Sequence, residues 1–116
     1  MSIKDVVNVE NAWEIIINRL FNKRQELSTL PKTNKKPIWF SAISDGNIIS
    51  INKASINEPS SKITAERKLT YTNFKEVYPL FIKRENDEKV SKEVSNKTRN
   101  QVYYFSLIGH LVYNYK

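Results

Sequence analysis

Few side chains of this sequence have the types and spacing that catalysis or metal binding requires. The chain contains no cysteine and a single histidine, His110. The lack of cysteine excludes disulfide scaffolds, cysteine zinc sites and thiol catalysis, and one histidine leaves a transition-metal ion almost without ligands. No serine and acid are spaced around His110 in a way that favours a catalytic triad. We therefore expect no catalytic residue, no metal site and no cofactor, and the balance leans against an enzyme.

One acidic pattern is nevertheless typical of an enzyme. Asp45, followed by Glu66-Arg67-Lys68, gives an acid and then E-x-K. Nucleases of the PD-(D/E)xK type use this arrangement to hold Mg²⁺ with two carboxylates and to orient the attacking water with the lysine. The hypothesis requires Asp45 and Glu66 to converge on one ion, whereas Asp45 is more simply the first residue of a hairpin turn. Short E-x-K matches are common in a lysine-rich chain, so a Mg²⁺-dependent nuclease is the least favoured function.

The positive charge is the strongest functional signal in the sequence. The formal net charge is +7. Residues 1–31 carry equal numbers of acids and bases, residues 32–75 hold eight basic and three acidic residues, and residues 94–116 hold three basic residues and no acid. The excess therefore lies in two stretches, 32–75 and 94–116. A concentrated positive field attracts phosphate backbones without reading their sequence.

Side chains that can bind phosphates and bases lie within these two stretches. Residues 96–101 gather Asn, Lys, Arg and Gln at an expected helix start, where free amides bind phosphate and where Asn, Gln and Arg can read base edges. Aromatic residues beside basic groups can stack on unpaired bases. We therefore predict a non-catalytic nucleic-acid-binding protein of bacterial or phage type, with DNA favoured over RNA. The candidate binding residues are Lys35, Lys36, Lys53, Lys62, Arg67, Lys68, Asn96, Lys97, Arg99, Asn100, Gln101 and Trp39.

Two other interpretations stay open. A high pI in a lysine-rich chain is often only a solvated surface, and Tyr103 and Tyr104 would then pack on the core with their hydroxyls in water. Alternatively, the chain is a protein-interaction module or an accessory part of a larger complex. The feature that favours this alternative is a mixed hairpin face that carries Trp39, Ile43 and Ile48.

Three predicted helices are the first of the elements that must position these residues. Apolar residues at helical spacing predict helices over residues 9–30, 72–84 and 98–114. Pro79 removes a backbone donor inside the second pattern, so it should kink or split that helix near Tyr78.

Capping patterns mark the starts of the later helices. Thr70 with Asn73, or Asn73 with Glu76, can cap the second helix, and Thr98 with Gln101 is a capping-box pattern for the third. These patterns locate the first residue of each of the two helices to within a few positions of the sequence.

Residues 38–53 are predicted to form a β-hairpin. Asp45-Gly46 is a favourable pair for a type I′ turn, which needs positive φ at both central positions. Such a turn pairs Ile43 with Ile48 and Phe40 with Ile51. One face then meets the core, and it carries Ile38, Phe40, Ala42, Ile49 and Ile51.

The alternation of residues 62–69 adds a possible third strand. The predicted fold is therefore α+β, with a small antiparallel sheet packed against three helices in the order α-β-β-(β)-α-α. The length of 116 residues suits a single domain over residues 1–116. The chain has no apolar run of membrane-spanning length, and the lack of cysteine suits a reducing cytoplasm.

Overall fold

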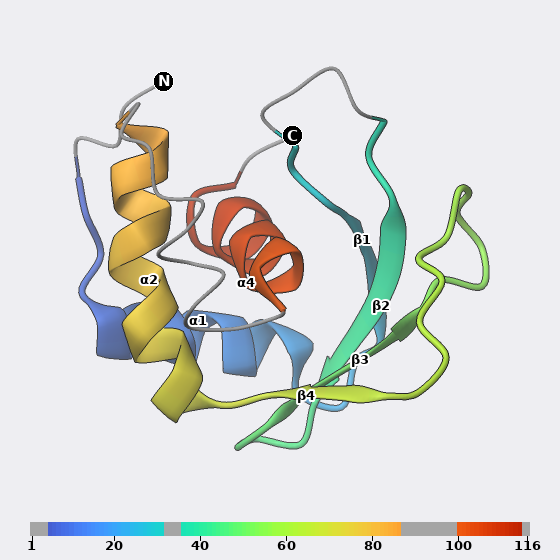
Figure 1. The fold of residues 1–116 in the computed structure, drawn as a ribbon. Helices are drawn as coiled ribbons and strands as arrows, with labels where there is room; N and C mark the ends of the chain where they lie inside the picture. The colour runs from blue at the N-terminus through green and yellow to red at the C-terminus, as the bar shows by residue number, and fades with distance from the viewer. Residues whose placement is uncertain (1–4, 32–35, 87–99, 115–116) are drawn as a thin grey trace.

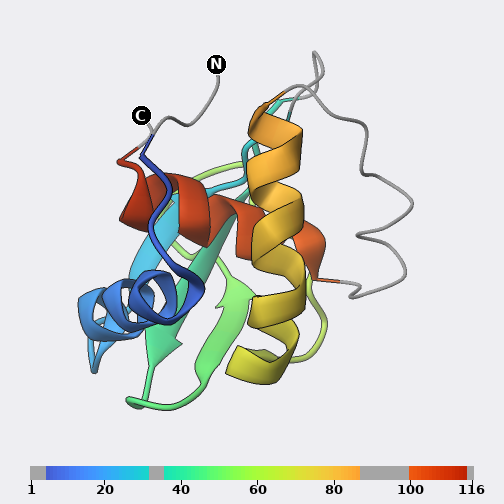
Figure 2. The same cartoon turned by 90° about the vertical axis from the view of Figure 1, so that its left-hand side faces the viewer.

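The computed structural model describes residues 5–31, 36–86 and 100–114. Within these ranges it places α1 (Val9–Leu20), β1 (Gln25–Ser28), β2 (Trp39–Ser44), β3 (Ile49–Lys53), β4 (Arg67–Leu69), α2 (Tyr71–Glu85), α4 (Gln101–Leu107) and a π-helical turn, η1 (Ile108–Val112). The described strands form one antiparallel sheet in the order β1-β2-β3-β4. Figure 1 and Figure 2 show α1, α2 and α4 together on one face of this sheet. The predicted α+β class and the three helices are confirmed, and the sheet gains a fourth strand.

The additional strand is β1, and it lies within residues 9–30, where the sequence predicted one continuous helix. That prediction is wrong in its second half. The helix ends at Leu20, and Asn22 then adopts a left-handed backbone with φ of 52°. Asparagine tolerates this conformation better than most residues, so it is a suitable place for the chain to turn back. Residues 25–28 run as β1 beside β2. Leu27 fits the apolar position of either element, so its spacing could not separate helix from strand.

The hairpin has the predicted buried face but a different register. Phe40 pairs with Lys53, and Ala42 pairs with Ile51, whereas the sequence predicted Phe40 opposite Ile51. A shift of two residues leaves every side chain on its original face, because side chains alternate along a strand. Four of the five expected core residues, Phe40, Ala42, Ile49 and Ile51, are fully buried, whereas Ile38 is 42% exposed.

The turn itself explains the changed register. Its central residues are Gly46 and Asn47, with Asp45 and Ile48 paired at its base. The Asp45 carboxylate accepts hydrogen bonds from the amides of Asn47 and Ile48, both at 2.8 Å. These bonds stabilise the turn one residue further along than predicted, and they lower the pKa of Asp45. Gly46 takes the left-handed backbone that the turn needs, with φ of 98°.

The later elements begin close to where the sequence placed them. The Thr70 hydroxyl accepts from the amide of Asn73 and caps α2, as predicted. The helix continues through Pro79 to Glu85, so the expected split near Tyr78 does not occur. The strand predicted over residues 62–69 is β4, and it is shorter than predicted, because only Arg67–Leu69 pair with β3.

The last helix keeps its place, and it buries a wider face than predicted, because Phe105, Ile108 and Leu111 of the expected stripe are buried together with residues beside the stripe. It begins at Gln101 and passes into η1 after Leu107. Val102, expected in the apolar stripe, is 44% exposed, whereas Tyr103 and Tyr104 are buried. Thr98, the first residue of the predicted capping box, lies outside the described residues.

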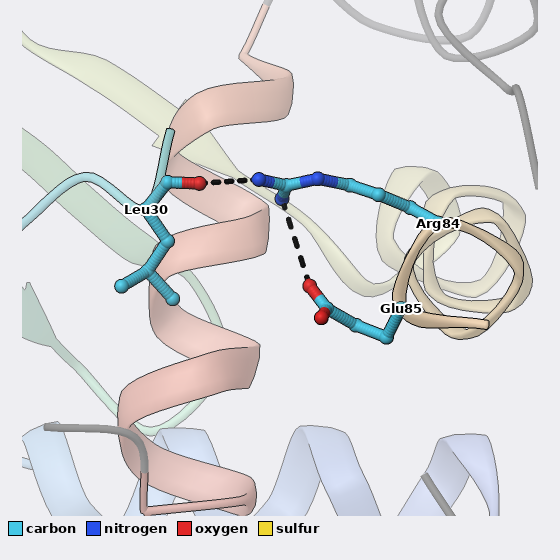
Figure 3. Close-up of polar contacts among 3 residues, drawn as sticks. All are labelled: Leu30, Arg84 and Glu85. Carbon is cyan, nitrogen blue, oxygen red and sulfur yellow. Dashed lines mark hydrogen bonds and ion pairs between the residues drawn. The ribbon is translucent and has the colours of Figure 1, made fainter. Parts of the chain in front are cut away.

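The end of α2 is fixed to the end of β1. Figure 3 shows that the Arg84 guanidinium donates to the Leu30 carbonyl and also reaches the carboxylate of Glu85, at 4.0 Å. The guanidinium carbon lies 4.9 Å from the centroid of the Phe105 ring. Glu85 is only 2% exposed and Arg84 is half-buried, so this charge pair lies at the edge of the interior.

A hydrogen-bond ring joins three distant segments of the chain. The Val7 amide donates to the Tyr113 hydroxyl at 3.2 Å, and the Tyr78 hydroxyl donates to the Val7 carbonyl at 2.5 Å. The two hydroxyls lie 2.5 Å apart. Burial raises the pKa of Tyr78, so its hydroxyl remains a protonated donor near neutral pH. Among the described residues, no helix is both long enough and apolar enough to cross a membrane.

Candidate nucleic-acid interface

The two basic stretches of the sequence meet at Arg67. The Nη1 of Arg67 donates to the Oδ1 of Asn100 at 3.0 Å. The same guanidinium lies over the ring of Tyr103, with its carbon 5.7 Å from the centroid. Arg67 belongs to the stretch 32–75, and both of its partners belong to the stretch 94–116. Neutral residues of the stretch 94–116 therefore lie beside a cation of the stretch 32–75, whereas Lys97, Arg99 and Lys116, the basic residues of 94–116, lie outside the described residues.

Tyr103 connects this contact to the segment that precedes β4. Its hydroxyl lies 2.8 Å from the Oγ of Ser61, and its ring packs edge-to-face on Phe40 with centroids 5.0 Å apart. Lys62 directly follows Ser61 in the chain and is exposed. Since Tyr103 is only 6% exposed, its ring is a fixed support for the guanidinium of Arg67.

Strand register adds Lys53 to the same side of the sheet. Arg67 pairs with Ile51, and Lys53 lies two residues beyond Ile51 on β3, so both cations extend from the face that carries the helices. Both side chains are exposed. We call this region the Arg67 surface, and it consists of Lys53, Lys62, Arg67, Asn100 and Gln101.

Two predicted binding residues lie on the other face of the sheet. Lys68 pairs with Ser50, and its charge contributes to the lowered pKa of Asp45 near the hairpin turn. Trp39 alternates with Phe40 along β2, so it also extends away from the helices, and it is half-buried. Neither residue belongs to the Arg67 surface.

The remaining predicted residues are Lys36, Lys35, Asn96, Lys97 and Arg99. Lys36 is exposed just before β2, at the same end of the sheet as Lys53. The other four lie outside the described residues, and so does most of the predicted cluster over residues 96–101. Its described members, Asn100 and Gln101, lie in the Arg67 surface.

The acidic pair that suggested a nuclease does not converge. Asp45 holds its own turn, whereas the Glu66 carboxylate accepts from the Nδ2 of Asn52 at 3.1 Å. Asn52 lies four residues along the chain from Ile48, the partner of Asp45, which is roughly 13 Å of strand. That separation is too long for two carboxylates to share one ion. No group of three metal-ligating side chains occurs in the described part of the chain.

His110 has a structural environment. Its Nε2 lies 2.9 Å from the Ser28 carbonyl oxygen and 3.4 Å from the Ser28 hydroxyl. The carbonyl can only accept, so Nε2 carries the proton and cannot remove one from the serine. The Ser106 hydroxyl donates to the same carbonyl at 2.6 Å. Both side chains therefore join the last helix to the end of β1.

Glu26 is a positioning residue that the sequence did not reveal, because residues 9–30 were expected to be helical. Its carboxylate accepts from three successive backbone amides, those of Ser55, Ile56 and Asn57, at 2.7–3.2 Å. It also accepts from the Ser55 hydroxyl and the Asn57 side-chain amide. These bonds, the one from the Ser55 amide foremost, lower the pKa of Glu26 to about 2. The loop that leads from Lys53 to Lys62 is therefore held against β1.

Replacing this carboxylate is expected to release the loop. In Glu26→Gln the amide protons of residues 55–57 should lose their downfield NMR shifts and take those of an unstructured loop, because charged acceptors form the stronger hydrogen bonds. In the unsubstituted protein the folded pKa lies below the ordinary value, so the contacts are complete above pH 4.5 and are lost as the pH falls through about 2. Glu10→Gln, an exposed change on α1, is the control and should leave these shifts unchanged. Unaltered shifts in Glu26→Gln would show that the carboxylate does not hold the loop.

Comparisons with protein-family models, with curated proteins and with solved structures find no match to this chain. The arrangement of charges and hydrogen-bond donors on the Arg67 surface is therefore the basis for an argument about function.

Proposed function

We propose that this chain is a non-catalytic nucleic-acid-binding protein, with DNA as the favoured ligand, and that it binds phosphates through the Arg67 surface. The observation that carries the proposal is the contact of Arg67 with Asn100 and Tyr103, which brings side chains of both basic stretches together. The lack of cysteine suits a reducing compartment, and we place this activity in the cytoplasm.

The chemistry of Arg67 supports phosphate binding. A guanidinium has five N–H donors, and the bond to Asn100 uses one of them. The contact with Tyr103 limits the orientations of the side chain, so less conformational entropy is lost when an anion binds. Lys53 and Lys62 add positive charge from neighbouring segments, and their exposure leaves them accessible to an extended polyanion.

Neutralising two cations of the Arg67 surface tests the proposal. Lys62→Gln with Arg67→Gln should weaken duplex DNA binding by roughly tenfold or more at 0.1 M salt, and it should reduce the slope of log K against log salt by about two. Fluorescence anisotropy across a salt series measures both quantities. The matched control, Lys23→Gln with Lys83→Gln, removes the same amount of charge. Lys23 lies on the turn after α1, and Lys83 lies on α2.

Two results would contradict the proposal. Equal losses in the two double variants would mean that binding follows net charge and not the Arg67 surface. A complete lack of salt-sensitive binding at low salt, with duplex DNA, single-stranded DNA and RNA probes, would remove nucleic-acid binding altogether.

A protein-interaction role is the second candidate, and Ile56 is the observation that favours it. This side chain is 83% exposed, although Glu26 holds its backbone in place. A large apolar side chain that is fixed in water is suited to a pocket on another protein. A stoichiometric partner that survives nuclease and high salt, and that is lost with Ile56→Ser, would favour this role over the first.

A further inference from the structure

We infer that the Arg67 surface takes an intact double helix through its phosphates and does not hold a single strand by stacking on its bases. This inference rests on the proposed function and names the class of nucleic acid. Proteins that bind single strands combine cationic grooves with aromatic rings whose faces are open to the bases. Duplex backbones need only cations and hydrogen-bond donors placed along the surface. Whether the face of each nearby aromatic ring is open or covered therefore distinguishes a single-stranded ligand from a duplex.

The ring inside the Arg67 surface is already covered. Tyr103 is 6% exposed, and the Arg67 guanidinium lies over its face. Phe40 contacts it edge-to-face, with the ring planes at 70°, and Ser61 binds its hydroxyl. A base could stack on Tyr103 only after Arg67 had moved away, which would remove the cation that attracts the phosphate.

The two tyrosines nearest to this region in sequence are also engaged. Tyr104 is 1% exposed, and its hydroxyl accepts from the amide of Thr70 at 3.2 Å. The ring of Tyr71 contacts Trp13 with centroids 6.0 Å apart, and the Nζ of Lys75 lies 5.8 Å from the same ring centroid. Neither ring offers a free face beside Arg67.

Within the described part of the chain, the more accessible aromatic side chains lie elsewhere. Trp39 extends from the opposite face of the sheet. Phe21 is 49% exposed, but it follows α1, bridges to Ser44 at the end of β2, and lies against the hairpin turn at Gly46. Arg67 lies on the edge strand β4, beyond β3, so Phe21 and Arg67 are separated by the width of the sheet.

Among the described residues of the Arg67 surface, the exposed groups are positive charges. Arg67, Lys53 and Lys62 supply this charge, and the half-buried side-chain amide of Gln101 adds a neutral donor. A duplex presents one phosphate charge per 1.7 Å of its axis, about twice the density of one strand. A fixed set of cations therefore releases more counterions from a duplex than from a flexible single strand.

The experiment compares a 20-base-pair DNA duplex with each of its separated strands. Anisotropy across a salt series should give an affinity for the duplex that is roughly tenfold higher, with a steeper salt dependence. Tryptophan emission is recorded in the same titrations. Trp13 is 8% exposed, so quenching by a stacked base would report on Trp39. We expect no quenching with either probe.

Three results would overturn this inference. If a single strand binds as tightly as the duplex without quenching, the ligand class is wrong and the proposed function stands. If a single strand quenches the emission, its bases stack on Trp39 on the other face of the sheet, so both the ligand class and the Arg67 surface are wrong. If neither the duplex nor the strands bind at low salt, the proposed function fails first and the inference falls with it.

Discussion

Replacing Phe74 by alanine is expected to lower the free energy of unfolding by ~3–5 kcal/mol, because truncating a buried phenylalanine loses apolar burial and leaves a cavity. Phe74 is fully buried on α2. Its ring centroid lies 5.0 Å from that of Trp13 on α1, 5.4 Å from that of Tyr78 and 6.2 Å from that of Tyr104 on α4. One side chain therefore joins the three helices that cover the sheet.

This loss is large compared with the whole stability of a small domain, which is typically ~5–15 kcal/mol. Urea unfolding followed by circular dichroism measures the change. Phe21→Ala is the matched control, because the same atoms are removed from a side chain that is 49% exposed. We expect it to cost about 1 kcal/mol or less. Equal costs for the two variants would contradict a central role for Phe74 in the core.

The parts of the fold that sequence patterns predicted are those that short-range chemistry decides. The cap of α2 depends on Thr70 and Asn73, three residues apart, so the pattern contains all that is needed. The buried face of the hairpin depends on alternation alone, and Phe40 and Ile51 keep their face under either register.

The parts that were wrong depend on competing interactions. Either of two adjacent residue pairs can form the turn, and the Asp45 carboxylate decides between them by binding the amides beyond it. Residues 25–28 form a strand because β2 lies beside them, and Glu26 finds its partners 29–31 residues away. The spacing of apolar residues within a short window shows neither the neighbouring strand β2 nor the distant partners of Glu26.

The same limit applies to the candidate binding residues. Composition located the basic side chains, but strand pairing sends the neighbours Arg67 and Lys68 to opposite faces of the sheet. The contact between Arg67 and Asn100 spans 33 residues of sequence, so no local pattern predicts it. Part of the predicted set therefore belongs to the Arg67 surface, and part of it does not.

Removing the carboxylate of Glu85 is expected to destabilise the fold almost as much as removing the Phe74 ring. Glu85 is 2% exposed, and its carboxylate lies 4.0 Å from the guanidinium of Arg84, which also donates to the Leu30 carbonyl (Figure 3). Glu85→Ala leaves the half-buried Arg84 guanidinium without this partner, and we expect a cost that approaches the ~3–5 kcal/mol of breaking a fully buried pair.

Removing both charges should lower the free energy of unfolding by less than the loss in Glu85→Ala suggests. In Arg84→Met with Glu85→Leu, apolar side chains of similar size replace the pair, and such replacements are often neutral or stabilising. The double variant should therefore be more stable than the sum of the two single changes predicts, and urea unfolding of all three gives the coupling free energy. The loss of the bond to Leu30 and of the contact with Phe105 limits how far the double variant can recover.

Glu76→Ala is the control on the same helix, because its side chain is exposed, and we expect it to change stability by no more than about 0.5 kcal/mol. A cost for Glu85→Ala as small as that of Glu76→Ala would show that water or another group compensates the charge of Arg84. Because Glu85 is buried at the end of α2, outside the Arg67 surface, its loss should act on folding alone. At temperatures where the Glu85→Ala protein is folded, its affinity for a DNA duplex should match that of the unsubstituted protein.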